Sequence, residues 1–223
     1  MKELKTVIFD MDGLMFDTEM MYYTANQKAA DEIGLSFTYD YYERYIGASD
    51  EEFFANMYKD FKDDEKVDAF IEKSRVYLLD HIESAGILVK PGLKELLAFL
   101  EEKGIRKGIA SSSRRNMIDL CVNSAGIAHY FDEIVSRDQV EFAKPSPEIF
   151  EKAWNLFDGE KDETVILEDS MNGIRAAFDA GIPVIMVPDL FQPTKEAEEK
   201  SLVIRKDLFE VKHFLQENWI FSN

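Results

Sequence analysis

Apolar strand-like segments that alternate with helical segments are the feature that most constrains the fold of this chain. Helical patterns of apolar residues occupy residues 93–103, 117–125, 149–156, 173–179 and 208–217. Strand-like segments occupy residues 6–9, 106–110, 133–135, 164–167, 183–187 and 202–204. Strands that alternate with helices form parallel sheets that are covered by helices on both faces. The sequence therefore predicts an α/β protein built on a parallel sheet.

The region between the first strand and residue 88 has a different pattern. Residues 20–33 fit a helix that ends at Gly34, because glycine often follows the last residue of a helix. Residues 35–84 contain no proline, and their apolar and aromatic residues recur at helical spacing. We expect an all-helical insertion with a small aromatic core, in which Ser49 or Asp50 caps one of the helices.

The composition narrows the possible partners. A formal net charge of −18 repels the phosphates of nucleic acids and the surface of anionic membranes, so we expect neither as a partner. A phosphate site in so acidic a protein needs local cations. The single cysteine, Cys121, excludes an intrachain disulfide framework, and its apolar neighbours predict a buried thiol. Because no secretory or membrane-spanning segment is evident, we expect a soluble, cytoplasmic protein.

Polar residues follow four of the predicted strands, at the edge where parallel sheets bind their ligands. They are Asp10 and Asp12 after the first strand, Ser111 and Ser112 after the second, Lys144 in the loop after the third, and Glu168 and Asp169 after the fourth. Taken singly, these could be an Asp-Gly turn, a helix cap or a surface lysine. Together they place four carboxylates at one edge, where each pair repels by about 4 kcal/mol at about 4 Å. This arrangement predicts a bound divalent cation.

The same residues suit a phosphate group. Mg²⁺ binds oxygen ligands, typically one or two carboxylates together with phosphate oxygens of the substrate. Gly13 allows a sharp turn. Successive backbone N–H groups in such a turn, including that of Met11, can donate hydrogen bonds to a bound anion. The hydroxyls of Ser111 and Ser112 precede a helix and could hold phosphate oxygens, and Lys144 supplies a positive charge. We therefore predict a site for Mg²⁺ and phosphate.

In these motifs and their order, the sequence resembles the phosphohydrolases of the haloacid dehalogenase superfamily. The resemblance is to the subgroup that includes β-phosphoglucomutase and small sugar-phosphate phosphatases, and it covers nearly the whole chain. Residues 10–13 match the first motif, Ser111 the second, Lys144 the third, and residues 168–169 the fourth. The resemblance implies a Rossmann-like core formed by residues 1–17 and 88–223. It also implies that residues 18–87 form an inserted helical cap domain.

The resemblance also implies roles for the motif residues. Asp10 would attack phosphorus and form an aspartyl-phosphate, and Asp12 would protonate the leaving oxygen and then activate water. The ligands of Mg²⁺ would be Asp10, the backbone carbonyl of Asp12, and Asp169, with Glu168 acting beside the metal and not as a direct ligand. Ser111 and Lys144 would hold the remaining phosphate oxygens.

The function implied is a phosphatase that acts on a small phosphorylated metabolite, either a sugar phosphate or a nucleotide-like compound. A monomer suffices for this architecture. A mutase of the β-phosphoglucomutase type is the first alternative, because Lys73 falls where those enzymes have a cap lysine. Tyr22 and Asp50 oppose it, because they stand where the mutases have a histidine and a phosphate-binding arginine.

Two other classes also need consideration. A signalling receiver domain also combines clustered acids, Mg²⁺, a hydroxyl residue and a lysine, but it lacks an acid such as Asp12 beside the phosphorylated aspartate and has no helical insertion. A nicotinamide-dependent enzyme is disfavoured, because no G-x-G-x-x-G sequence follows the first strand.

Residues of the cap and its hinges are expected to determine specificity. The candidates are Asp17, Glu19, Tyr22, Ser49, Asp50, Lys73 and Arg114. The acids Asp17, Glu19 and Asp50 suit the hydroxyl groups of a sugar or nucleoside better than a second anionic group.

Overall fold

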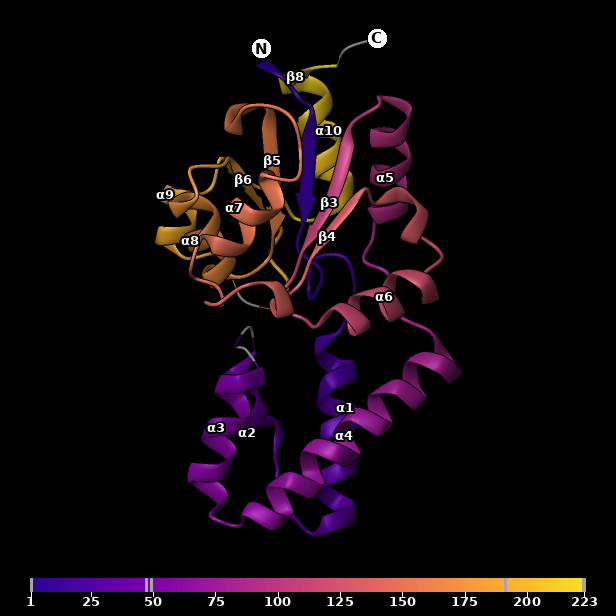
Figure 1. Cartoon of the computed structure of the whole chain (residues 1–223), viewed down its shortest axis with the longest axis vertical. Coiled ribbons are helices and arrows are strands. Elements are labelled where there is room, and N and C mark those ends of the chain that lie inside the picture. The colour runs from indigo at the N-terminus through magenta and orange to yellow at the C-terminus, as the bar shows by residue number, and fades with distance from the viewer. Residues whose placement is uncertain (1, 47, 49, 191, 222–223) are drawn as a thin grey trace. The chain divides into compact units, whose positions relative to one another are not determined.

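The computed structural model describes residues 2–46, 48, 50–190 and 192–221, and the chain forms two compact units (Figure 1). The first, which we call the core unit, comprises Met1–Phe16 and Leu88–Asn223. The second, which we call the inserted unit, comprises Asp17–Ile87. The insertion therefore interrupts the core unit directly after its first long strand.

The described residues of the core unit form a parallel sheet of six strands, in the order β4-β3-β2-β5-β6-β7. The strands are β2 (Thr6–Phe9), β3 (Arg106–Ala110), β4 (Glu133–Val135), β5 (Thr164–Glu168), β6 (Val184–Met186) and β7 (Val203–Ile204). Each neighbouring pair is parallel. The prediction of an α/β protein with a parallel sheet and a helical insertion is confirmed.

The strand order reverses beside β2, and this reversal locates the ligand-binding edge. The chain runs outward from β2 through β3 to β4, then returns to β5 on the other side of β2. Ligands of open α/β sheets bind at such a switch point, beyond the carboxyl ends of the strands. Phe9 of β2 is in register with Ile109 of β3 and Leu167 of β5. This register places Asp10, the residue that follows β2, level with Ala110 and Glu168, the last residues of β3 and β5.

Helices cover both faces of the sheet (Figure 1). They are α5 (Leu93–Glu102), α6 (Arg115–Ser124), α7 (Glu148–Trp154), α8 (Met171–Asp179), α9 (Lys195–Lys200) and α10 (Leu208–Asn218). On one face, α7 and α8 contact the central strands, and a fully buried cluster there includes Ile8, Phe150 and Ile174. Burying each such side chain contributes about 1.5–3 kcal/mol to folding. Helices α5 and α10 contact each other, and α5 also contacts β3.

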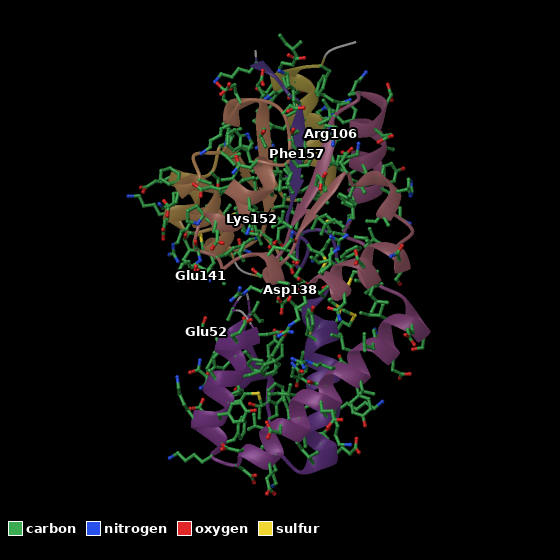
Figure 2. The ribbon with its side chains drawn as sticks, viewed as in Figure 1. Glu52, Arg106, Asp138, Glu141, Lys152 and Phe157 are labelled. Carbon is green, nitrogen blue, oxygen red and sulfur yellow. The ribbon has the colours of Figure 1, made fainter. Side chains whose placement is uncertain are left out.

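Near the amino end of β3, an aromatic ring packs against the strand. The guanidinium of Arg106 lies 5.4 Å from the ring centre of Phe157 (Figure 2). The same ring covers Gly108, where a Cβ atom would lie 2.9 Å from two of its carbons. Glycine at position 108 thus makes room for Phe157.

Short elements account for most differences from the predicted elements. The two-residue strands β1 (Lys2–Glu3) and β8 (Trp219–Ile220) pair with each other, and they are too short to show a periodic pattern. The six-residue helix α9 was likewise not predicted. Helix α8 begins at Met171, two residues before the predicted start, because the hydroxyl of Ser170 accepts the N–H of Gly173 and caps the helix.

The inserted unit is all helical. Its elements are α1 (Glu19–Ile33), α2 (Tyr39–Tyr42), the 3₁₀ turn η1 (Glu43–Tyr45), α3 (Asp50–Phe61) and α4 (Asp64–Ala85). Helix α1 ends at Gly34, whose φ of 65° is a left-handed conformation, as predicted. The rings of Phe37, Phe53 and Phe70 contact one another in its buried aromatic core. In the described part of the chain, no helix is long and apolar enough to cross a membrane.

Candidate active site

The chain leaves β2 directly into an acidic turn. The N–H of Asp10 still donates to the carbonyl of Leu167 at 3.0 Å, which continues the strand pairing by one residue. Asp10 is buried, with 6% of its surface exposed. Gly13 has a φ of 79°, a left-handed conformation that glycine adopts without steric cost. Met11, the next residue of the turn, is fully buried.

Lys144 contacts residues of the first and fourth motifs, Asp10 and Glu168. Its ammonium donates to Oδ1 of Asp10 at 2.5 Å, to Oε1 of Glu168 at 2.7 Å and to the carbonyl of Ala110 at 3.2 Å. The side chain is only 5% exposed. Burial lowers the pKa of Lys144, but the two carboxylates outweigh it and hold the pKa above its usual value. The ammonium is therefore charged and fixed at the strand ends.

Glu168 is held in place by several groups. Its Oε2 accepts the N–H of Ser170 at 2.7 Å and the hydroxyl of Ser170 at 3.0 Å, while Oε1 accepts from Lys144. A Cβ atom on Gly173 would lie 1.7 Å from Oε1 of Glu168, so a glycine in α8 makes room for this carboxylate. Both oxygens of Glu168 are thus engaged within the protein.

Asp10, Glu168 and Asp169 form a cluster that fits a cation. One carboxylate oxygen from each residue lies within 4.8 Å of the others. Burial, followed by the neighbouring charges, raises the pKa of Asp10 and of Asp169, although Lys144 opposes this. A divalent cation would supply the missing positive charge, and oxygen ligands suit Mg²⁺. The donor set and its electrostatics therefore fit Mg²⁺.

The loop after β3 contributes hydroxyl groups. Ser111 is fully buried, and its hydroxyl oxygen accepts the N–H of Ser113 at 3.0 Å. The hydroxyl of Ser113 donates to Oδ2 of Asp12 at 2.7 Å. Ser112 and Arg114 are exposed residues of the same loop. The loop therefore contacts the acidic turn after β2 through Ser113.

Comparisons with known proteins agree with this geometry. The family model of haloacid dehalogenase-like hydrolases matches residues 7–187. The chain belongs to this family.

Individual relatives support the assignment. A phosphorylated carbohydrates phosphatase from Thermotoga maritima is 32% identical over 184 residues, which cover 80% of this chain and 82% of that protein. A β-phosphoglucomutase from Bacillus subtilis is 30% identical over 224 residues, which cover 97% and 96%. The crystal structure of a β-phosphoglucomutase from Clostridium difficile superposes with a TM-score of 0.77, at 26% identity and 96% coverage of both chains. The chain is thus an enzyme of the haloacid dehalogenase-like hydrolase family, whose relatives include proteins named as phosphatases and as mutases.

Three further residues lie beside the predicted site: Ser113, which belongs to the same run of serines as Ser111 and Ser112, and Asp189 and Lys90, which sequence reasoning missed. Ser113 contacts Asp12, as described above. Asp189 follows β6 and lies beside Gly13, and it forms a partly buried ion pair with Lys90. The rule that residues after strand ends carry the chemistry also applies to Asp189. The sequence gives no such signal for Lys90, because in the sequence it does not follow any of the predicted strands.

The structure places the remaining candidates of the hydrolase in the inserted unit. Glu19 accepts the hydroxyl of Tyr42 at 2.8 Å, and Lys73 donates to Glu32 at 2.6 Å. Tyr22 packs against the aromatic core, Asp17 is half-buried, and Asp50 is the exposed first residue of α3. Ser49 lies outside the described residues.

Proposed function

We propose that this hydrolase is a Mg²⁺-dependent phosphatase that cleaves a small phosphorylated metabolite through an aspartyl-phosphate on Asp10. The observation that carries the proposal is the convergence of Asp10, Lys144, Glu168 and Asp169 at the carboxyl ends of β2 and β5. Such a group of buried charges destabilises a fold unless it serves a ligand or a reaction.

In this proposal, Asp10 is the nucleophile. One carboxylate oxygen attacks phosphorus, an Asp10–phosphorus bond forms, and the bond from phosphorus to the leaving oxygen breaks. Lys144 orients Asp10 and neutralises charge on the phosphoryl oxygens. The buried hydroxyl of Ser111 and the backbone N–H of Met11 hold further phosphoryl oxygens, with Ser112 at the rim. The phosphoryl group thereby meets donors that are fixed before it binds.

Asp12 is the proposed acid and base. It donates a proton to the leaving oxygen in the first step, then removes one from the water that cleaves the aspartyl-phosphate. Its hydrogen bond from Ser113 fixes the carboxyl group beside the turn that carries Asp10. A second acid next to the nucleophile is what enables hydrolysis.

The residues that would hold Mg²⁺ are Asp10, Asp169 and the backbone carbonyl of Asp12. When bound, the cation supplies charge neutralisation for phosphoryl transfer. Glu168 is proposed to act beside the cation, because Lys144 and Ser170 already engage both of its oxygens. Its contribution is then to hold Lys144 and to add negative charge.

A phosphorylated sugar is the proposed substrate class, with nucleotide-like compounds second. Its support is the relative named as a phosphatase of phosphorylated carbohydrates. Asp17, Glu19 and Asp50 of the inserted unit are proposed to accept hydrogen bonds from substrate hydroxyls. Tyr22, Ser49, Lys73 and Arg114 remain further candidates for substrate contact.

A mutase activity is the second candidate, favoured by the 30% identity to a β-phosphoglucomutase. The mutase alternative drew on Lys73, whose ammonium is instead paired with Glu32 on the surface of the inserted unit. Tyr22 and Asp50 also argue against it. Membership of the hydrolase family argues against the receiver-domain alternative.

The test is phosphate release with Mg²⁺ over a panel of phosphorylated sugars, nucleotides and small acids. The proposal expects one class to be hydrolysed, and Asp10→Asn to lose roughly 10³-fold or more of the rate. Glucose 1-phosphate isomers with a bisphosphate primer are tested in parallel for isomerisation. Isomerisation without phosphate release would establish the mutase instead.

A further inference from the structure

Asp189 is an acid of the core unit that the proposed reaction does not use. It follows the last residue of β6 by three positions, so it lies at the same edge of the sheet as Asp10. Its side chain is 11% exposed. Its Oδ2 atom is buried and has no hydrogen-bond partner among the described residues. A buried carboxylate oxygen without a partner is unfavourable, so its position needs an explanation.

Gly13 shows where this oxygen is directed. A Cβ atom on Gly13 would lie 2.3 Å from Oδ2 of Asp169 and 3.3 Å from Oδ2 of Asp189. The two carboxylate oxygens therefore lie beside the same point above the glycine. Asp189 adds a negative charge next to the cluster that fits a cation.

The other oxygen of Asp189 pairs with Lys90. The Lys90 ammonium donates to Oδ1 of Asp189, and the two side chains are 19% and 11% exposed. Lys90 lies two residues after Leu88, where the chain returns to the core unit. Its backbone N–H donates to the carbonyl of Met15 at 2.9 Å. The pair thus places a positive and a negative charge beside the turn that contains Gly13.

We propose that Asp189 and Lys90 form a charge pair that sets the affinity of the Asp10–Glu168–Asp169 cluster for Mg²⁺. The inference rests on the proposed function, because it assumes that the cluster holds this cation. The Asp189 carboxylate attracts the cation and the Lys90 ammonium repels it, and the partly buried setting limits screening by salt. Asp189 is then a positioning residue that acts through the cation and does not touch the substrate.

The opposite signs of the two charges give a sharp test. Asp189→Asn removes the attracting charge and keeps the size of the side chain, and Lys90→Met removes the repelling charge. If the pair served only to hold the loop after β6, both substitutions would weaken cation binding or leave it unchanged. Opposite effects arise only if the charges act on the cation.

The experiment is calorimetric titration of Mg²⁺ into the metal-free full chain, without substrate. We expect Asp189→Asn to raise the Kd about tenfold or more, as other residues around metal sites do. Lys90→Met is expected to lower the Kd, and the double variant to bind close to the wild type. Glu163→Gln is the matched control, because it removes one negative charge from an ion pair with Lys5 at the opposite, amino end of β5. Its Kd is expected to equal that of the wild type.

The inference is overturned if both single variants change the Kd in the same direction, or if neither changes it. Absence of Mg²⁺ binding by the wild type would overturn the proposed function together with the inference. Binding that is abolished by Asp169→Asn but unaffected by Asp189→Asn would overturn the inference alone. Should Asp189→Asn fail to fold, tighter binding by Lys90→Met supports the inference, and unchanged or weaker binding overturns it.

Discussion

The two units use acidic side chains in opposite ways. In the core unit, carboxylate oxygens of Asp10, Glu168 and Asp169 lie within 4.8 Å of one another in a buried cluster. In the inserted unit, Glu19 accepts a hydrogen bond from the Tyr42 hydroxyl at 2.8 Å, at the margin of an aromatic core. The first arrangement concentrates like charges, and the second satisfies each charge locally.

This difference shows how a functional site can be distinguished from a structural feature. Clustered, buried carboxylates cost folding free energy until a cation arrives, so selection for stability alone would remove them. A carboxylate that accepts a tyrosine hydroxyl contributes modestly to stability and needs no ligand. A second pair of this kind is Tyr41 and Asp60: the Tyr41 hydroxyl donates to Asp60 at 3.0 Å, and burial raises the pKa of Tyr41, so this hydroxyl keeps its proton. The predictions below test this contrast.

Lys144→Met is expected to have the largest effect. It leaves Asp10 and Glu168 buried without their ammonium partner, which costs about 3–5 kcal/mol of the free energy of unfolding at neutral pH. Urea titration measures this loss, and phosphate release is expected to disappear with it. The control is Lys73→Met, which breaks an exposed ion pair in the inserted unit and should leave stability unchanged. Equal losses in the two variants would contradict the contrast.

Gly173→Ala is expected to cost about 1–3 kcal/mol, because its Cβ atom would lie 1.7 Å from Oε1 of Glu168. The displaced carboxylate should also lower the rate of phosphate release. Gly34→Asn provides the comparison in the inserted unit. No atom lies within 4 Å of a Cβ there, and asparagine tolerates the left-handed conformation, so stability should change by less than about 1 kcal/mol. The contrast fails if both glycines tolerate substitution equally.

Mg²⁺ is expected to raise the Tm by several degrees, and by more at about pH 8 than at about pH 5.5. Burial raises the pKa of Asp10 and Asp169, so the folded metal-free protein binds protons that the unfolded chain has released. Stability of the metal-free protein therefore falls as pH rises from the unfolded pKa, about 4, towards the folded values. Because Mg²⁺ must displace those protons, its affinity rises over the same range. Thermal melts at both pH values check this, and a Tm shift that is larger at the lower pH would refute it.

Tyr42→Phe is expected to have the smallest effect, about 1 kcal/mol, because it removes the hydroxyl that donates to Glu19 and keeps the buried ring. Urea titration measures the loss, and turnover of an artificial aryl phosphate should be unchanged. A loss of turnover as large as that of Lys144→Met would mean that the inserted unit also holds catalytic charges.

Much of the core could be predicted from the sequence, because strands that alternate with helices bring every strand end to one edge. Asp10 follows β2 and Glu168 is the last residue of β5, and these two strands are neighbours in register. The contact of Lys144 with Asp10, 134 positions away, depends on the packing of its loop and was not determined by any local pattern.

The predictions were incomplete where the chemistry depends on loops. Asp189 was missed because it stands three residues beyond β6, after Pro188, and its relevance comes from its position beside Gly13 in the structure. The sequence does not distinguish Ser113 from its neighbour Ser112, whereas in the structure Ser113 donates a hydrogen bond to Asp12 and Ser112 is exposed. In the inserted unit, helical periodicity predicts burial, but it does not predict which surface side chains meet a substrate.

The bridge between Phe16 and Val89 has an evolutionary consequence. These residues pair in antiparallel fashion, so the chain leaves the core unit and returns to it at adjacent positions. The insertion of 71 residues, Asp17–Ile87, therefore connects to the core unit at two neighbouring points, as a short loop would. The ancestral core could exchange one insertion for another without rebuilding its strand register. Catalytic chemistry and substrate preference can then be inherited as separate modules, and chimeric enzymes could be assembled by exchanging the segment between these two residues.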